Sequence, residues 1–300
     1  MTRIQLEQSS PKLGVIEDNL EAHCRSIVEA SEAGVRLLVF PELSLTGYLL
    51  KDLVPDVALP TRELVRRLQE GTEGVSEIEV VVGFAEDSPR HRFYNSAAVL
   101  RWDEEGRVEP VHVHRKIYLP TYGLFDEARY YSAGRVIRAF DSAYLGRCGV
   151  LICEDAWHAS LPLLLSIDGP RLEGAGVLVV VSNSPARGVG TDGEGAPASH
   201  RVWEDLLKTY SRLLEMVVIY ANRGGVEDGL SFAGGSHVLA AGGEPLASLP
   251  LFESGLLEVD LDWPEVVRGY RIRSPVSAAE NIDLLQRELK RIVKKGVEED

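Results

Sequence analysis

Short apolar runs separated by amphipathic segments constrain the fold of this chain most strongly. The runs read VRLLVF, IEVVVGF, CGVLIC, GVLVVVSNS and VVIYANR, at residues 35–40, 78–84, 148–153, 176–184 and 217–223. Nearly continuous apolar stretches of this length are typical of strands that are buried on both faces. Strands of this kind predict an α/β protein, because helices must then cover both faces of the sheet.

The intervening segments support one α/β domain. Helical spacing of apolar residues predicts helices over 17–34, 61–72, 200–216 and 278–295, and a helix or irregular turn over 158–169. Alternation predicts a short strand at residues 4–8, a hairpin over 94–113 around DEEGR, and a β-meander over 230–262. No composition break or repeat divides the chain.

Composition excludes several classes of protein. The 300 residues carry a net charge of −14, whereas nucleic acid binding needs a concentrated basic surface. No apolar run approaches the roughly 20 residues needed to span a bilayer, and the N-terminus does not read as a cleavable signal. Three cysteines are too few for a disulfide framework, which favours a reducing cytoplasm. Neither a CxxC motif nor a histidine pair at ligand spacing appears, so we expect no metal and no cofactor.

Three reactive side chains stand at or near predicted strand ends, where α/β proteins commonly place functional groups. Glu42 follows the first apolar run, Lys116 follows the hairpin, and Cys153 ends the run CGVLIC. Each signal alone is weak, since a lone cysteine after an apolar run is more often a core residue. Cys24 and Cys148 keep that structural interpretation.

Together, the three residue types meet the needs of thiol-based amide cleavage. The thiolate is the attacking species, so the thiol needs a base or a positive neighbour. A buried carboxylate can accept the proton, and a cation or backbone N–H groups can stabilise the oxyanion that forms. Glu42, Lys116 and Cys153 supply these functions without histidine, although composition alone does not establish that they meet.

Three longer motifs resemble those of the nitrilase, or carbon–nitrogen hydrolase, superfamily. They are VFPELSLTGY with Glu42, HRKIYLPTYGLFDEARYY with Lys116 and GVLICEDAW with Cys153, in that order. The resemblance extends from about residue 4 to about residue 262. It implies a four-layer α-β-β-α sandwich, a homodimer or higher homo-oligomer, and a Glu–Lys–Cys triad that cleaves linear amides through a thioester.

Within the superfamily, the chain is most similar to the glutaminase domain of glutamine-dependent NAD synthetase. ELSLTGYLLKDL, LPTYGLFDEARYY, ICEDAW and NRGGVEDGLSFAGGS carry this likeness. It implies that Tyr122 and Phe125 line the amide pocket and that Glu127 is a secondary acid near Lys116. It also implies that Glu154 and Ser184 hold the amino-acid end of glutamine.

The sequence departs from that branch in two ways. No ATP-using synthetase domain and no Gly-rich phosphate loop occurs in these 300 residues, so we expect a standalone hydrolase, either self-contained or supplying ammonia to a separate ATP-dependent synthetase. A Gly-rich acidic stretch separates Arg187 from Arg201, and either could bind a substrate carboxylate. An N-carbamoyl or other ω-amide hydrolase and a non-catalytic subunit remain alternatives. We expect the hydrolase domain over 1–270 and a helical extension of the same domain over 271–300.

The two cysteines of the run CGVLIC give the first prediction. Cys153→Ala should abolish ammonia release from amides and leave the fold intact, because it removes the nucleophile and little volume. Cys148→Ala, the matched control, should keep its activity and cost about 1 kcal/mol of stability. Near-normal ammonia release by Cys153→Ala would exclude the thioester mechanism.

Overall fold

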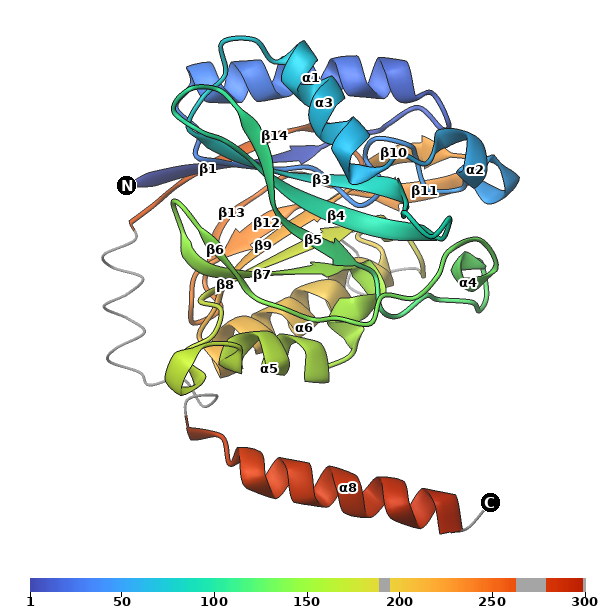
Figure 1. Ribbon diagram of the computed structural model, residues 1–300, viewed down its shortest axis with the longest axis vertical. Coiled ribbons are helices and arrows are strands. Elements are labelled where there is room, and N and C mark those ends of the chain that lie inside the picture. Colours follow the sequence, from blue (N-terminus) through green and yellow to red (C-terminus); the bar gives the residue numbers. More distant parts are fainter. Residues whose placement is uncertain (189–194, 263–278, 299–300) are drawn as a thin grey trace.

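The computed structural model describes residues 1–188, 195–262 and 279–298, with side chains described up to residue 294. Two six-stranded sheets dominate this part of the chain (Figure 1). The first runs in the order β14 (Gly255–Leu261), β1 (Thr2–Gln8), β2 (Leu37–Val39), β3 (Ile78–Asp87), β4 (Phe93–Trp102), β5 (Val108–Arg115). The second runs in the order β13 (Pro245–Ser248), β12 (His237–Leu239), β9 (Val217–Asn222), β8 (Val177–Ser182), β7 (Gly146–Ile152), β6 (Phe140–Ser142).

Helices cover the outer face of each sheet, which confirms the four-layer α-β-β-α sandwich (Figure 1). α1 (Ile16–Glu32) and α3 (Thr61–Gly71) pack on the first sheet, and α5 (Ser160–Ile167) and α6 (Ala198–Leu214) on the second. The shorter helices are η1 (Lys51–Leu53), α2 (Val54–Val57), α4 (Glu127–Tyr130), η2 (Cys153–Trp157) and η3 (Pro170–Leu172). No helix in the described ranges has the length and apolar character needed to cross a membrane.

Strand β8 shows why its first five residues are all apolar. Val177, Val179 and Val181 pack between the two sheets, whereas Leu178 and Val180 pack against α5 and α6. Successive side chains of a strand point to opposite faces, so a strand covered on both faces needs apolar residues throughout. A strand with helices on both faces therefore has the same sequence pattern as a strand with helices on one face and a second sheet on the other.

That ambiguity explains one wrong expectation. The apolar runs alone predicted a sheet covered by helices on both faces, but the inner face of each sheet is covered by the other sheet. The predicted β-meander over 230–262 is also wrong. Its strands are divided among three sheets: β11 (Leu230–Ala233) pairs with β10 (Gly224–Glu227), β12 with β9 and β13, and β14 with β1. Local alternation identifies a strand but does not specify its partner.

Most other predicted elements are confirmed. The hairpin over 94–113 is formed by β4 and β5, and residues 158–169 contain the helix α5. The closing helix is α8 (Ile282–Glu298). The expected domain boundary at residue 270 lies outside the described residues, so that division stays a prediction.

Strand direction places four strand ends at one end of the sandwich. β2 and β3 are parallel, β4 is antiparallel to β3, and β5 is antiparallel to β4, so β5 runs in the direction of β2. In the second sheet β7, β8 and β9 are mutually parallel. Glu42, Lys116, Cys153 and Asn183 all follow carboxyl ends of these strands.

Gly83 in β3 allows the turn after β2 to cross close to the sheet. A Cβ at this position would lie 2.3 Å from Pro41 O, 2.4 Å from Leu43 N and 2.8 Å from the Glu42 carbonyl carbon. These are backbone atoms, which cannot move aside as a flexible side chain can. The closeness of the turn to β3 therefore fixes the backbone of Glu42.

Gly83→Ala should lower the free energy of unfolding by about 1–3 kcal/mol, because overpacking a tight contact forces the backbone to shift. Gly176→Ala is the control, since a Cβ there meets nothing within 4 Å. Its stability should stay within about 0.5 kcal/mol of the wild type. Urea unfolding followed by tryptophan fluorescence measures both, and equal midpoints for the two variants would contradict the close approach.

Candidate active site

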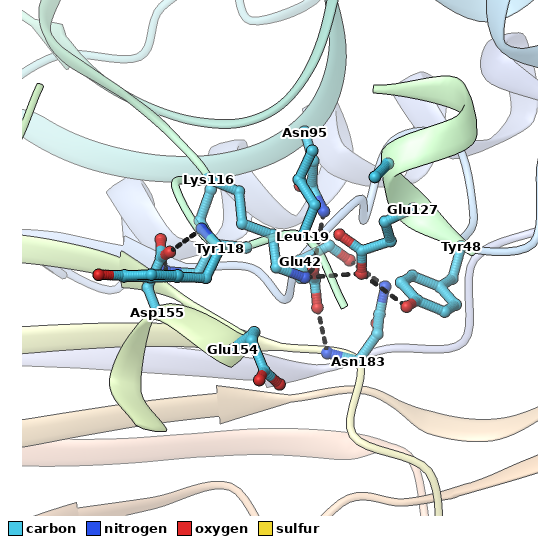
Figure 2. A network of polar contacts seen from close by, with 12 residues as sticks. Glu42, Tyr48, Asn95, Lys116, Tyr118, Leu119, Glu127, Glu154, Asp155 and Asn183 are labelled. Carbon is cyan, nitrogen blue, oxygen red and sulfur yellow. Dashed lines mark hydrogen bonds and ion pairs between the residues drawn. The ribbon is translucent and has the colours of Figure 1, made fainter. Parts of the chain in front are cut away.

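The Lys116 ammonium occupies the centre of a buried polar cluster between the sheets' carboxyl ends (Figure 2). Nζ lies 2.7 Å from Glu42 Oε1 and 2.7 Å from Glu127 Oε1. All three side chains are buried. Because a buried charge is stable only when it is paired, the ammonium and the two carboxylates depend on one another.

Additional hydrogen bonds fix the Glu42 carboxylate. Asn95 Nδ2 donates to Oε1 at 2.7 Å, and the backbone N–H of Asn183 donates to Oε2 at 2.7 Å. Asn183 Nδ2 also donates to the Glu42 carbonyl at 2.7 Å. Asn183, directly after β8 of the second sheet, thus holds the carboxylate that follows β2 of the first.

Burial and charge shift the protonation of this cluster. Burial alone disfavours the Lys116 ammonium, but the carboxylates of Glu127 and Glu42 outweigh it and raise the pKa of Lys116 well above its usual value. Burial, partly offset by Lys116, raises the pKa of Glu127 to about 7. Glu127 Oε2 is buried and has no hydrogen-bond partner among the described residues. Lys116 therefore stays charged, while Glu127 exchanges a proton near neutral pH.

Cys153 begins η2 directly after β7 and is only partly buried. Its φ of 44° lies in the left-handed region, which is uncommon for a residue other than glycine. Crowding of the sulfur by protein atoms and the nearby Glu42 carboxylate raise the pKa of the thiol, and Lys116 partly offsets them. The resting thiol is therefore protonated and lies within electrostatic reach of both side chains.

Asp155 ties the cysteine turn to the segment that follows β5. Its Oδ1 accepts the backbone N–H groups of Ile117 and Tyr118, each at 2.9 Å, and its Oδ2 lies 2.8 Å from His114 Nε2. The carboxylate is completely buried. Lys116 lies between His114 and Ile117 in the chain. Asp155 therefore fixes the position of Lys116 relative to the turn that carries Cys153.

A second buried ion pair supports Glu127 indirectly, through Tyr48. Tyr48 OH donates to Glu127 Oε1 at 2.6 Å, and the backbone N–H of Tyr48 donates to Glu227 Oε1 at 2.9 Å. Glu227 in β10 pairs with Arg223 at 2.5 Å, and both side chains are buried. The small β10–β11 sheet therefore anchors the tyrosine that orients Glu127.

The residues expected to bind substrate form two groups. Tyr122 OH donates to the Glu154 carboxylate at 3.0 Å, and the ring of Phe125 lies edge-on to Tyr122, with centroids 5.9 Å apart. Ser184 lies deeper, and its Oγ accepts the Trp203 indole N–H at 2.8 Å. The Ser184 hydroxyl therefore still has its O–H group and one lone pair for a ligand.

The structure distinguishes the two candidate arginines. The Arg187 guanidinium carbon lies 5.9 Å from the Phe125 ring centroid, and its charge acts on Tyr122. Arg201 lies in the first turn of α6. Part of the Gly-rich stretch between the arginines, residues 189–194, lies outside the described residues. Arg187 is thus the cation placed beside the aromatic pair.

Several supporting residues were missed from the sequence. Asn183 lies at the end of the apolar run over 176–184, so the strand-end rule that found Cys153 could have found it. Asp155 lies in a quoted motif, but its backbone contacts span 37 or 38 residues. Tyr48 and Glu227 also lie in quoted motifs, but nothing near them in the sequence indicated their contact, and Asn95 gave no local signal. No cluster of three His, Cys, Asp or Glu side chains in the described ranges could hold a metal ion.

A carbon–nitrogen hydrolase family model matches residues 3–271. The chain belongs to this family. It is an amide-bond hydrolase by family and has the fold of the nitrilase superfamily.

Three known proteins illustrate its similarities. The glutamine-dependent NAD(+) synthetase of Thermotoga maritima is 33% identical over 268 residues, which are 89% of this chain and 43% of that protein. The structure of glutamine-dependent NAD+ synthetase from Acinetobacter baumannii matches with a TM-score of 0.72 and 31% identity, over 87% of this chain and 46% of the other. An amidase of the nitrilase superfamily from Nesterenkonia AN1 matches with a TM-score of 0.68 and 25% identity, over 90% and 94% of the chains. The chain spans about half the length of the curated relatives it matches.

The raised pKa of Glu127 predicts a pH-dependent stability. The native state binds this proton more tightly than the unfolded state, so stability falls as pH rises from the ordinary value of 4.5 to about 7. The wild type should lose about 3 kcal/mol relative to Glu127→Gln across this window. Glu104→Gln, at an exposed turn, should follow the wild type. Urea unfolding at several pH values measures this, and parallel curves for the wild type and Glu127→Gln would contradict the assignment.

Proposed function

We propose that the protein cleaves a linear amide through a thioester on Cys153. Glu42 accepts the thiol proton as the sulfur attacks the amide carbon, and then gives a proton to the leaving nitrogen, which departs as ammonia. Glu42 next takes a proton from water, which attacks the thioester and releases the acid and the free thiol. The observation that carries this proposal is the single buried cluster in which Glu42, Lys116 and the Cys153 thiol interact.

Lys116 has the position and charge of an oxyanion donor. The tetrahedral intermediate carries a negative charge on the former carbonyl oxygen, and a fixed ammonium stabilises it without reorganisation. The backbone N–H of Glu154, directly after the nucleophile, is the second donor in this proposal. Glu127 is the secondary acid: it keeps Lys116 charged and fixed, and Tyr48 orients it.

Glutamine is the proposed substrate. A free amino acid presents an ammonium and a carboxylate, which require an acid and a base near the pocket. Glu154 would bind the ammonium and Arg187 the carboxylate, with Tyr122 and Phe125 beside the side-chain amide and Ser184 donating a hydrogen bond. The similarity to two glutamine-dependent NAD synthetases supports this choice.

The ammonia would then serve a separate ATP-dependent synthetase. The similarity of this chain to glutamine-dependent NAD synthetases supports this proposal. The alternative is a self-contained amidase acting on an N-carbamoyl or other ω-amide, which is favoured by the near-complete coverage of the Nesterenkonia amidase. A non-catalytic subunit is the third possibility.

We also propose a homodimer or higher homo-oligomer in a reducing cytoplasm. Leu164 on α5 is 44% exposed, and on α8 the exposed apolar residues include Leu289, Ile292 and Val293. Exposed apolar helix faces favour association. The three free cysteines, among them the proposed nucleophile, suit a reducing compartment.

The glutamine proposal predicts a specific loss in Arg187→Ala. This variant should raise KM for glutamine more than it lowers kcat, since the carboxylate contact is a binding interaction. Arg201→Ala should behave like the wild type. A simple aliphatic amide of similar length should be a poorer substrate than glutamine and should be insensitive to Arg187→Ala.

Steady-state ammonia release from glutamine, the aliphatic amide and an N-carbamoyl amino acid measures this. Equal kcat/KM for glutamine and the aliphatic amide would contradict the glutaminase proposal and leave the Glu42–Lys116–Cys153 chemistry standing. Release from none of the amides would favour a non-catalytic subunit.

A further inference from the structure

A large cavity lies apart from the cysteine site. It is a groove of about 1100 Å³ lined by the turn between β3 and β4, the start of α3, the end of β5 and residues 133–136. None of Glu42, Lys116, Glu127 or Cys153 lines it. Pockets for small molecules usually enclose roughly 300–1,000 Å³, so the groove has room for a ligand of nucleotide size.

The charge of this groove is opposite to that of the chain. Five arginines line it, against the two acids Glu86 and Asp87; they are Arg62, Arg90, Arg92, Arg115 and Arg135. The whole chain carries a net charge of −14. A local excess of positive charge in an acidic protein concentrates anions at that place. We call this cavity the arginine groove.

Four of the arginines are available to a ligand. The side chains of Arg62, Arg90, Arg92 and Arg135 are exposed and make no hydrogen bond or ion pair with any residue in the described ranges. Unpaired arginines from three separate segments of the chain converge on one cavity. Since most surface arginines elsewhere in the structure are paired with acids, this convergence is unusual for the molecule.

The fifth arginine, Arg115, is held rigidly in the wall of the groove. Arg115 donates to both oxygens of the buried Glu86, at 2.7 and 2.5 Å, and its guanidinium lies 4.2 Å from the Tyr94 ring centroid. Glu86 also accepts the Ser96 hydroxyl at 2.8 Å. These contacts neutralise Glu86 and fix the Arg115 side chain. Binding of a ligand therefore does not have to pay the entropy of ordering this side chain.

Hydrogen bonds also order the turn that carries two of the free arginines. The Ser88 N–H donates to the Arg92 carbonyl at 3.0 Å, and the Arg92 N–H donates to the Ser88 hydroxyl at 3.1 Å. The His91 N–H donates to the Ser88 carbonyl at 2.8 Å. Arg90 and Arg92 therefore project from a defined turn.

We propose that the arginine groove binds a small molecule carrying two or more linked phosphate groups. The planar guanidinium fork matches phosphate oxygens in a bidentate way, and several forks around one cavity match several phosphates. A single carboxylate or phosphate would leave most of these arginines without a partner. A long nucleic acid is disfavoured because the rest of the acidic molecule would repel it. This inference does not depend on the proposed amidase reaction.

Isothermal titration of the full chain at physiological salt tests the proposal with four probes: tripolyphosphate, ATP, AMP and inorganic phosphate. Tripolyphosphate and ATP should bind saturably at one site, and AMP and phosphate at least about tenfold more weakly, since fewer charge-assisted bonds form. Similar affinities for tripolyphosphate and ATP would identify the phosphates as the recognised group. Much tighter ATP binding would identify a nucleotide.

Two variants localise the site. The double variant Arg90→Gln/Arg135→Gln should weaken tripolyphosphate binding by about tenfold or more. Arg171→Gln, at an exposed arginine of η3 that lines no part of the groove, should bind as the wild type does. Circular dichroism checks that both variants are folded.

Three results would overturn the proposal. They are no saturable binding of tripolyphosphate at millimolar concentration, unchanged affinity in the folded double variant, and binding of poly-glutamate without binding of tripolyphosphate. The last would assign the groove to an acidic protein partner instead.

Discussion

A fully buried ammonium is stable only beside negative charge, because its transfer from water to the protein interior costs several kcal/mol even after relaxation. Lys116 meets this condition with two carboxylates at 2.7 Å, and their repulsion is in turn reduced by the ammonium between them. Removing Lys116 would leave two buried carboxylates side by side without a cation. The cluster therefore fixes the relative positions of the turn after β2, the end of β5 and the short helix α4.

The two-sheet architecture brings these groups together. Glu42 comes from the first sheet and is held by Asn183 of the second, while Cys153 comes from the second sheet and its turn is tied by Asp155 to the segment after β5. Backbone geometry contributes as well, since Leu43 and Cys153 have φ values of 46° and 44°. Such conformations persist only where the surrounding contacts enforce them. Each sheet thus positions the reactive group of the other.

The sequence predicted the elements and the three central residues better than it predicted their surroundings. Strand ends are local features, so Glu42, Lys116 and Cys153 could be found from them, and the ordered motifs indicated the four-layer fold. The partner of each strand is a long-range property, which explains why β11 to β14 were misread as a meander. Glu227 lies 179 residues from Tyr48, and no local pattern indicates that contact. Arg187 could be distinguished from Arg201 only by its place beside Phe125.

The most direct test of a thioester on Cys153 is whether added hydroxylamine competes with water for the intermediate. A thioester on Cys153 reacts with hydroxylamine to give a hydroxamate, whereas an amide attacked directly by water gives only the acid. With an amide that the protein cleaves, the account predicts that hydroxamate replaces the acid as hydroxylamine is increased, and that Cys153→Ala forms neither product. Ammonia release that yields only the acid at saturating hydroxylamine, or hydroxamate formation by Cys153→Ala, would contradict it.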